Sequence, residues 1–398
     1  MYLEFNKKSL NAVWIFDLIS GIYRLYSTIF YKIHIMKKLL ISTGGGDCPG
    51  LNAVIRGITK RALQEGGWEV WGSFEAFNGL MEEPSRLIKL DEKNTAGIHV
   101  LGGTILGTTN KGNPIRFSEK QADGSIKVVN KIPDLVAKLK AEGFEAVINI
   151  GGDGSQEISQ AMYEAGMPVV GVPKTIDNDL SSTDFTFGFQ TAVQIATDSF
   201  DRLVTTAASH HRVMIMEVMG RNAGWIALYT AIAGGAEICL IPEIPYDLDE
   251  VVEKIESRYN KGRGFVNIVI AEGAHAKEGS ITSSQGEEGR ISVRLGGVAY
   301  TLSEQLKAAG IDADIRETVL GHTQRGGTPI AFDRVIASVF GVKAFELVLE
   351  KKFGQLIVLL NNDYTSVPIK EAISAYNYVD PKGVLVEAAK GLGISFGD

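Results

Sequence analysis

The sequence has 398 residues, of which 45% are hydrophobic and 22% are charged, and its formal net charge is −7. This is a globular composition, and the length predicts two domains or one elaborate α/β unit. The net negative charge does not favour binding to nucleic acid. No apolar stretch reaches the roughly 18 residues that a membrane-spanning helix requires. Cys48 and Cys239 form no metal-binding or disulfide pattern, which indicates reduced thiols in a cytoplasmic protein.

Residues 1–35 carry apolar side chains at helical spacing, but Asp17 and Arg24 interrupt them, which excludes a secretory signal peptide. Three interpretations remain open: a helix docked on the body, an interfacial membrane helix, and an extension outside the functional fold. Met36 starts a run that leads straight into the first expected strand. We therefore treat residues 1–35 as an N-terminal extension, and we do not expect membrane contact.

Short β-rich runs alternate with segments of helical periodicity from residue 36 onward. This alternation predicts an α/β fold with parallel sheets covered by helices on both faces. The expected strands cover residues 38–42, 70–74, 146–150, 169–172, 212–218, 238–241 and 266–271. The expected helices cover residues 52–65, 156–165, 191–207, 223–233, 249–261 and 296–309. The polar residues 277–290 are expected to form a flexible loop.

Ligands of open α/β sheets gather at the carboxyl ends of the strands, so the segments that follow the expected strands are the informative ones. Residues 43–52 contain three consecutive glycines after the first strand. Their backbone N–H groups could hold an anion, or the segment could be a tight turn capped by Asp47. Residues 101–111 form a second glycine-rich segment, in which Lys111 could face either a phosphate or solvent.

A third glycine loop, residues 151–155, lies between an expected strand and an expected helix and reads Gly-Gly-Asp-Gly-Ser. Asp153 is a suitable ligand for Mg²⁺, which binds few carboxylates and keeps its other positions for water and phosphate. Ser155 could cap the helix. We favour a phosphate-binding role, because glycines on both sides of the aspartate leave room that a capping turn does not need.

Residues 173–179, Pro-Lys-Thr-Ile-Asp-Asn-Asp, follow the next expected strand and carry two carboxylates, Asp177 and Asp179. This pattern predicts general-base chemistry on a hydroxyl group. The alternative is a turn that caps the following helix, which explains one aspartate more easily than two.

Cationic side chains gather in two further segments, 216–224 and 316–327. Arg221 follows one strand and opens a helix, and His322 and Arg325 stand beside paired glycines. Arginine suits the forked recognition of phosphate, so these segments predict an anion-binding pocket, with surface charges as the alternative.

In combination and in this order, these motifs resemble the phosphofructokinase family, from Lys37 to the C-terminus. The specific ones are Pro-Lys-Thr-Ile-Asp-Asn-Asp, Glu-Val-Met-Gly-Arg and Gly-His-Thr-Gln-Arg-Gly-Gly. The resemblance implies phosphorylation of fructose 6-phosphate at its 1-hydroxyl, the committed step of glycolysis, by a cytoplasmic enzyme. It also implies two doubly wound Rossmann-like domains. Residues 36–188 and about 323–375 would bind the donor nucleotide, and residues 189–322 with the C-terminal segment would bind the sugar phosphate.

The resemblance also assigns roles to single residues. Asp177 would take the proton of the attacking hydroxyl, with Thr175 orienting the loop and Lys174 neutralising charge. The sugar contacts would come from Met219, Gly220, Arg221 and Glu243, and the 6-phosphate contacts from Arg316, His322 and Arg325. Asp153 would bind Mg²⁺, and the other donor contacts would come from Gly45, Asn110, Lys111, Gly154 and Ser155. Arg212 and Arg316 would reach into a neighbouring subunit's site, in a homodimer or homotetramer.

The phosphoryl donor is predicted from Gly154 and Lys174. Members of the family that use pyrophosphate typically carry aspartate at the position of Gly154, where a carboxylate would repel the α-phosphate of ATP. Lys174 is typical of the pyrophosphate users. We favour ATP, since a lysine side chain can swing aside, and pyrophosphate remains the alternative. Many relatives carry arginine at the position of Asn110, so here Lys111 could supply the charge.

Two other functions are weighed against this one. A non-catalytic paralogue that only binds sugar phosphates would have lost Asp177 or Asp153, and both are present. The Gly-Gly-Asp-Gly-Ser loop alone also fits NAD kinases and diacylglycerol kinases, against which the Gly-His-Thr-Gln-Arg-Gly-Gly segment argues.

Overall fold

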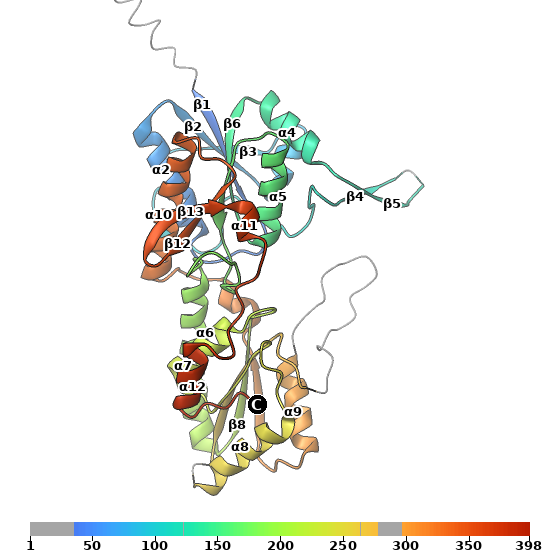
Figure 1. The fold of residues 1–398 in the computed structure, drawn as a ribbon, viewed down its shortest axis with the longest axis vertical. Coiled ribbons are helices and arrows are strands. Elements are labelled where there is room, and N and C mark those ends of the chain that lie inside the picture. The colour runs from blue at the N-terminus through green and yellow to red at the C-terminus, as the bar shows by residue number, and fades with distance from the viewer. Residues whose placement is uncertain (1–35, 122, 263, 278–296) are drawn as a thin grey trace, which may run out of the picture.

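The computed structural model describes residues 36–121, 123–262, 264–277 and 297–398. The expectations for residues 1–35, and nearly all of those for residues 277–290, therefore lie outside the described residues. Within these ranges, no helix is long and apolar enough to cross a membrane. Two lobes follow one another along the long axis of the molecule, and each is built around its own sheet (Figure 1).

The larger sheet has seven strands in the order β13-β12-β7-β6-β1-β2-β3. Its strands are β1 Lys37–Thr43, β2 Trp68–Ser73, β3 Leu87–Leu90, β6 Phe144–Gly151, β7 Val169–Pro173, β12 Gln355–Leu360 and β13 Asp363–Pro368. The neighbours from β12 to β2 pair in parallel, and β3 and β13 add antiparallel edges. The antiparallel edges are short or charged, which limits pairing with other chains.

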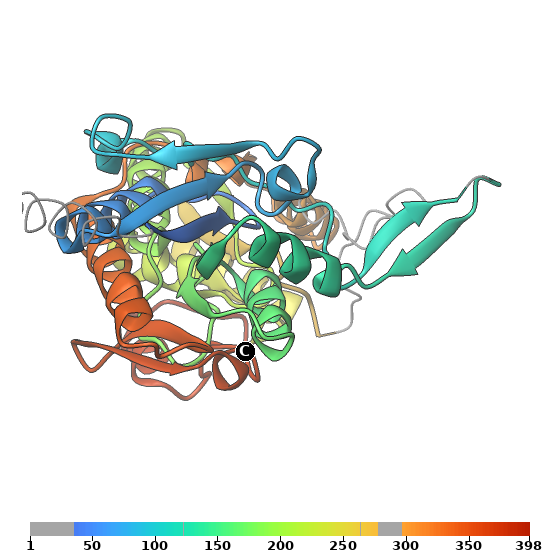
Figure 2. The same ribbon diagram turned by 90° about the horizontal axis from the view of Figure 1, so that it is seen from above.

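The smaller sheet has four parallel strands in the order β11-β8-β10-β9. These are β8 Val213–Val218, β9 Ile238–Leu240, β10 Val266–Ala271 and β11 Ile315–Val319. The prediction of an α/β fold with mainly parallel sheets is therefore confirmed, and every expected strand is present with small shifts at its ends. A separate ribbon, β4 Phe117–Lys120 and β5 Ile126–Val129, projects from the body (Figure 2).

Both faces of the larger sheet are covered because its strands alternate apolar side chains between the two faces. Leu39 and Ile41 pack with helices α2 (Leu51–Glu65) and α10 (Ala331–Leu349), whereas Leu40 packs with α4 (Ile132–Ala141) and α5 (Asp153–Glu164). Helices α2 and α10 lie unusually close. A Cβ atom added to Gly341 would stand 2.4 Å from the carbonyl oxygen of Val54.

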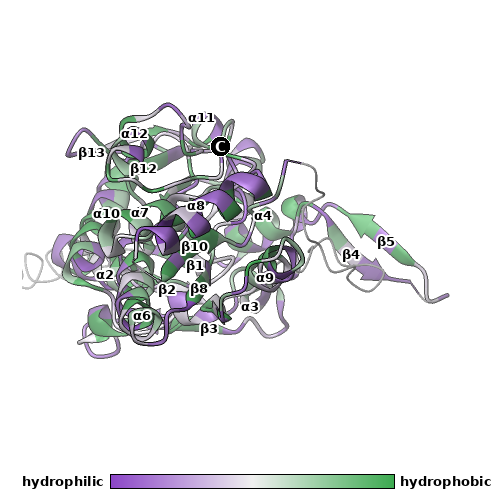
Figure 3. Cartoon of the chain, turned by 90° about the horizontal axis from the view of Figure 1, so that it is seen from below, coloured by the Kyte–Doolittle hydropathy of each residue, from purple (hydrophilic) through white to green (hydrophobic). Residues whose placement is uncertain are grey.

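The smaller sheet is covered in the same way. Helices α6 (Phe189–His210), α7 (Trp225–Gly234) and α12 (Val384–Gly391) pack on one side, and α8 (Leu248–Asn260) and α9 (Val298–Ala308) on the other. Helix α8 is amphipathic: Val251 and Ile255 are buried, while most of its other residues are hydrophilic (Figure 3). The expected helices are thus all found, as far as the described residues extend.

A buried carboxylate joins the two lobes. Helix α6 begins after Gly188, whose backbone φ is 95°, and its first turn has no side-chain cap of its own. Asp333 of α10 supplies the acceptor instead, taking a hydrogen bond of 2.7 Å from the backbone N–H of Thr191 and another from its hydroxyl. Helix N-termini need such partners for their free N–H groups. The start of α6 is therefore fixed to the helix layer of the larger lobe.

Candidate active site

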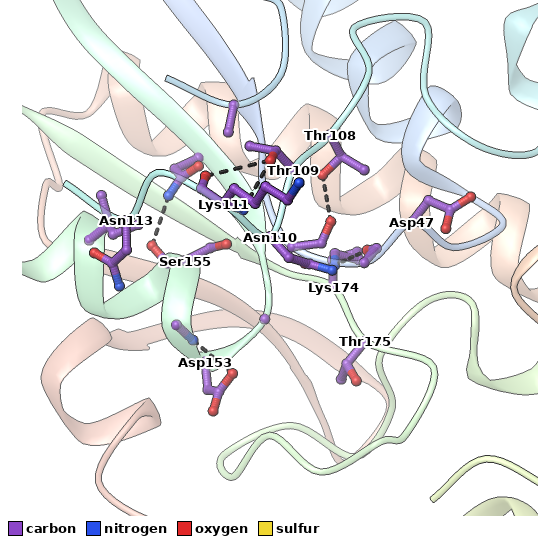
Figure 4. A pocket seen from close by; sticks show the side chains of 18 of the residues that line it. Asp47, Thr108, Thr109, Asn110, Lys111, Asn113, Asp153, Ser155, Lys174 and Thr175 are labelled. Atoms are coloured by element: carbon purple, nitrogen blue, oxygen red, sulfur yellow. Dashed lines mark hydrogen bonds between the residues drawn. The ribbon is translucent and has the colours of Figure 1, made fainter. Parts of the chain in front are cut away.

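A cavity of about 710 Å³ lies where the two lobes meet. It is lined by residues that follow β1, β6 and β7 of the larger sheet and β8 and β11 of the smaller one. The lining residues are Asn149, Ile158 and residues within the segments 44–47, 76–78, 108–114, 152–155, 174–179, 219–221 and 322–325, and Figure 4 shows part of them. The cavity is therefore at the carboxyl ends of the strands of both sheets, where ligands of α/β folds bind.

The structure brings most of the candidate residues to this one cavity. The candidates of the larger lobe that line it are Gly45, Asn110, Lys111, Asp153, Gly154, Ser155, Lys174, Thr175 and Asp177. The residues of the smaller sheet that line it are Met219, Arg221, His322 and Arg325. Four candidates, Gly220, Arg212, Arg316 and Glu243, are not among the described residues that form its wall.

The first glycine loop packs tightly against its surroundings. Gly45 has a φ of 79°, and its N–H donates to the carbonyl of Thr109 at 3.1 Å. A Cβ added to Gly44 would lie 2.6 Å from the Ser155 hydroxyl, and one added to Gly46 would lie 2.9 Å from the Arg325 guanidinium. Glycine is needed here because three other loops of the cavity approach the backbone closely.

Asp153 is the first residue of α5 and stands at the cavity surface (Figure 4). Its Oδ1 accepts the N–H of Gly154 at 2.7 Å, and its Oδ2 accepts the hydroxyl of Tyr376 at 2.7 Å. A Cβ added to Gly154 would meet nothing within 4 Å. The cavity is therefore open beside Gly154, and the carboxylate of Asp153 is held in a fixed orientation at its edge.

The loop after β7 carries two half-buried carboxyl groups, Asp177 and Asp179, and both line the cavity. Burial raises the pKa of Asp177, although Arg325 and Lys174 oppose the shift. Burial also raises the pKa of Asp179 to about 6, helped by the charges of Asp177 and Asp153. The Oδ1 of Asp177 is buried and accepts no hydrogen bond from any described residue. A buried carboxylate with a raised pKa and a free oxygen has the properties of a general base.

The turn between these carboxyl groups is held by Asn178, which has a left-handed φ of 52°. Its side-chain oxygen accepts the N–H of Thr186 at 2.9 Å, and its amide group donates to the carbonyl of Asp184. Asparagine is one of the few residues other than glycine that adopts this conformation readily. The turn therefore directs both carboxyl groups to the same side of the loop.

Lys174 is buried beneath the cavity floor, and this burial lowers its pKa. Its ammonium group donates a hydrogen bond to the carbonyl of Gly46. The loop after β7 is therefore tied to the loop after β1. The lysine side chain faces the cavity without projecting freely into it.

The cationic wall comes from the smaller lobe. Arg325 lies in the 3₁₀ turn η2 (Gly321–Arg325), and its guanidinium donates to the carbonyl of Asp47 at 3.3 Å. Gln324 accepts the backbone N–H of Met219 at 2.8 Å, which fixes this turn to the loop after β8. Arg221 is exposed and free to meet a ligand. Three cationic or ionisable groups, with His322 the third, thus face the two aspartates across the cavity.

Glu243 is placed differently from the expectation. Both of its carboxylate oxygens accept the backbone N–H of Gly224, at 3.0 and 3.1 Å, and one also accepts the N–H of Val379 at 2.9 Å. Burial raises its pKa. Because its oxygens are engaged by the backbone and the side chain is not part of the cavity wall, the geometry does not support the expected contact with a sugar.

Arg212 and Arg316 also lie away from the cavity of their own chain. They stand at the amino ends of the adjacent strands β8 and β11, opposite to the cavity. Both bind Asp314, at 2.6 and 2.7 Å. A residue at this end of the sheet cannot contact a ligand in the cavity of the same chain.

Two residues near the cavity were not singled out from the sequence. Glu272 follows β10, and burial raises its pKa while Arg325 and Arg221 oppose the shift. Its position directly after the expected strand 266–271 was a usable signal. Tyr376, which binds Asp153, offered no such signal because its partner lies 223 residues away.

The fold is thus that of a two-sheet α/β protein whose cavity combines glycine loops, buried carboxyl groups and arginines. The family model of phosphofructokinases matches residues 38–348. The chain is 46% identical over 365 residues to ATP-dependent 6-phosphofructokinase 2 of Clostridium perfringens, which covers 91% of this chain and 99% of that relative. The chain belongs to the phosphofructokinase family.

Further comparisons extend the range of relatives. A pyrophosphate–fructose 6-phosphate 1-phosphotransferase of Amycolatopsis methanolica is 43% identical over 343 residues, which is 86% of this chain and 96% of that one. Among solved structures, Pichia pastoris phosphofructokinase in the T-state superposes with a TM-score of 0.70 at 29% identity. That match covers 90% of this chain, and this chain spans 37% of the Pichia chain.

Proposed function

We propose that this chain transfers the terminal phosphoryl group of ATP to the 1-hydroxyl of fructose 6-phosphate, giving fructose 1,6-bisphosphate and ADP in the cytoplasm, as a step of glycolysis. The observation that carries the proposal is the position of Asp177. Its buried, unpartnered oxygen lies between a wall of glycine loops and a wall of cationic side chains. The first wall suits the phosphates of a donor, and the second suits a phosphorylated acceptor.

The acceptor would be held by the smaller lobe. Arg221, His322 and Arg325 offer charged and hydrogen-bonding groups to the 6-phosphate, and Met219 lines the same cavity. Glu272 follows β10, and its carboxyl group interacts electrostatically with Arg325 and Arg221. Binding through a phosphate remote from the reacting hydroxyl fixes the geometry of the reaction.

Asp177 would act as the base in the transfer. The 1-hydroxyl oxygen forms a bond to the γ-phosphorus, its proton passes to Asp177, and the bond from that phosphorus to the leaving oxygen of ADP breaks. Thr175 supports the loop, since its hydroxyl accepts the N–H of Asp177 at 3.1 Å. Arg325 lies near Asp177 and would stabilise negative charge on the transferring group.

Asp153 fits a role in binding Mg²⁺. The described residues contain no cluster of three or more His, Cys, Asp or Glu side chains that could hold a metal by themselves. One accessible carboxylate at a phosphate-binding loop matches the coordination that Mg²⁺ prefers, with donor phosphates and water completing it. When bound, Mg²⁺ neutralises charge on the donor phosphates. Ser155 and the backbone of Gly154 would contact the same phosphates.

ATP is favoured as donor because the cavity continues beyond Gly154. A Cβ at Gly154 would meet nothing within 4 Å, and the partly exposed Ile158 lines the same cavity, so there is room for a nucleotide that pyrophosphate does not need. Asn110 and Lys111 stand on the same side and would contact the phosphates. Pyrophosphate remains the second candidate because Lys174, a residue typical of the pyrophosphate users, lines the cavity, and because one relative carries the pyrophosphate name.

Initial rates with MgATP and with magnesium pyrophosphate, each with fructose 6-phosphate, test the proposal directly. We expect turnover with ATP and little with pyrophosphate. Turnover with pyrophosphate alone would contradict the donor assignment. Preference for NAD or diacylglycerol over fructose 6-phosphate as acceptor would contradict the function itself.

The position of Arg212 and Arg316 supports a homo-oligomer with shared sites. These arginines are half-exposed and face away from their own cavity, so a neighbouring subunit's sugar phosphate could bind them. Mixing two inactive variants, Arg212→Ala and Asp177→Ser, and refolding them together tests this idea. Shared sites predict recovered activity in the mixture, and independent sites predict none.

A further inference from the structure

The segment between helices α11 (Ile369–Ala372) and α12 passes from the larger lobe to the smaller one along the edge of the active site (Figure 1). Helix α11 packs against α5 of the larger lobe, and α12 packs against α7 of the smaller lobe. We call residues 374–380 of this segment the strap. The strap therefore joins the two lobes that are proposed to bind the two substrates.

Asn377 fixes the strap to both lobes. On the larger lobe, its backbone N–H donates to the carbonyl of Asp179 at 2.9 Å, and its side chain donates to the carbonyl of Asn178 at 2.9 Å. On the smaller lobe, the indole N–H of Trp225 donates to the carbonyl of Asn377 at 2.7 Å. Three hydrogen bonds on one residue thus hold the strap directly against the loop that carries Asp177.

Tyr376 is the strap residue that reaches the donor side. Its backbone forms a β-bridge with Leu180, and its hydroxyl donates to Oδ2 of Asp153 at 2.7 Å. The ring of Tyr378 lies beside the ring of Tyr376, with their centroids 5.9 Å apart.

We propose that Tyr376 is a positioning residue for Mg²⁺, which orients the carboxylate of Asp153 toward the metal and the donor phosphates. The inference rests on the proposed function, because it takes Asp153 as the residue that holds the metal. One oxygen of Asp153 accepts the N–H of Gly154 and the other accepts Tyr376, so the carboxylate cannot rotate freely. Each oxygen keeps a further lone pair for the metal or its water ligands.

Hydrogen-bonding partners of metal ligands commonly contribute about 10–100-fold to metal affinity, because they fix the ligand's orientation. Removal of the Tyr376 hydroxyl should therefore weaken metal binding while leaving the sugar site intact. The strap supplies the rigidity for this effect. Since Asn377 is anchored on both lobes, the phenol is held in place by the backbone and not by its ring contacts alone.

The test compares three variants of the full chain, Tyr376→Phe, Tyr378→Phe and Asp153→Asn. Tyr378→Phe is the matched control, because it removes a phenol from the same strap whose hydroxyl bonds to no described residue. Binding of Mn²⁺, used in place of Mg²⁺, is measured by electron paramagnetic resonance with a non-hydrolysable ATP analogue. The melting temperature of each variant and its KM for fructose 6-phosphate are measured in parallel.

We expect Tyr376→Phe to weaken Mn²⁺ binding about tenfold, Tyr378→Phe to change it less than twofold, and Asp153→Asn to weaken it most. The KM for fructose 6-phosphate should stay within about twofold in Tyr376→Phe. Metal binding as tight as in the unmodified chain, or tighter, would overturn the inference. Tighter binding would mean that the phenol competes with the metal for Asp153.

The outcomes also separate this inference from the proposed function. If Asp153→Asn weakens Mn²⁺ binding and Tyr376→Phe does not, only the role of Tyr376 is wrong. If Asp153→Asn binds Mn²⁺ normally, both the metal assignment and the role of Tyr376 are wrong. If the unmodified chain does not phosphorylate fructose 6-phosphate, the function is wrong, while the metal measurements still decide the role of Tyr376.

Discussion

The two sheets contribute side chains of opposite charge to the same cavity. The larger sheet contributes the half-buried carboxyl groups of Asp177 and Asp179, together with the exposed Asp153. The smaller sheet contributes Arg221, Arg325 and His322, which face them. Burial raises the pKa of Asp177 and of Asp179, so these two carboxyl groups are costly to ionise, whereas Arg221 remains accessible to solvent.

This difference indicates a division of labour. Buried groups with perturbed pKa values suit the chemical step, and accessible cations suit the capture of a charged substrate. Changes on the larger sheet should therefore act mainly on kcat or on the choice of donor. Changes on the smaller sheet should act mainly on the KM for the sugar phosphate. Variants on the two sheets test this division.

Replacement of Asp177 by Ser should lower kcat by roughly 10²–10⁴-fold, the range for loss of a general base. Fructose 6-phosphate binding should be largely kept, because the cationic wall is unchanged. Steady-state kinetics and a direct binding titration measure the two effects separately. Loss of sugar-phosphate binding in this variant would mean that Asp177 supports the loop instead of acting in the chemistry.

Replacement of Gly154 by Asp should abolish use of ATP, since the new carboxylate would project into the open space beside the donor phosphates and repel them. We expect kcat/KM for MgATP to fall by at least about 100-fold, which corresponds to about 2.7 kcal/mol. Gly154→Ala is the matched control. A Cβ at this position meets nothing within 4 Å and favours the helix, so the alanine variant should remain active.

Replacement of Arg221 by Ala should raise the KM for fructose 6-phosphate by about 10–100-fold, the range expected for a lost hydrogen bond to a charged group. The kcat should change much less. Arg202→Ala, on the exposed side of α6 in the same lobe, is the control and should leave both constants unchanged. An effect of Arg221→Ala on kcat alone would contradict the division between the sheets.

Replacement of Asp179 by Asn should stabilise the fold at neutral pH. The folded pKa of about 6 lies above the ordinary value of 3.8, so ionisation is disfavoured in the folded state. The stability of the parent chain therefore decreases as pH rises from about 4 through 6. The variant has no carboxyl group at this position, so its stability does not decrease for this reason. Denaturant unfolding should show an advantage of about 3 kcal/mol at pH 7 and a smaller one at pH 5. A gain in stability that is the same at pH 5 and pH 7 would show that the ionisation of Asp179 is not its cause.

The local parts of the site were predictable from the sequence. Gly45, Asp153 and Asp177 each follow an apolar run within a few residues, so a strand and its loop can be recognised together. Because parallel strands share one carboxyl edge, separate loops could be expected to meet. The arginine segments were recognised in the same way, and Arg221 and Arg325 line the cavity.

The remaining features depend on contacts between distant parts of the chain. The pairing of α10 with α2 relies on a close approach at Gly57 and Gly341, which no periodicity indicates. Arg212 is the first residue of an expected strand, but only the direction of β8 shows that it faces away from the cavity. From the sequence, the charge of Glu243 made a contact with the sugar plausible. Only the structure shows that its oxygens accept backbone N–H groups instead.

The placement of the last strands has a consequence for synthesis on the ribosome. Strand β12 pairs with β7 although α6 to α10 and the whole smaller sheet lie between them in sequence. At the other end, Ser395 pairs with Ile238 and bonds to the backbone beside β9. Neither sheet can acquire its final partners until nearly all of the described chain has emerged. The nascent protein must therefore keep apolar strand edges from associating with other chains throughout its synthesis, a task for which chaperone contact is suited.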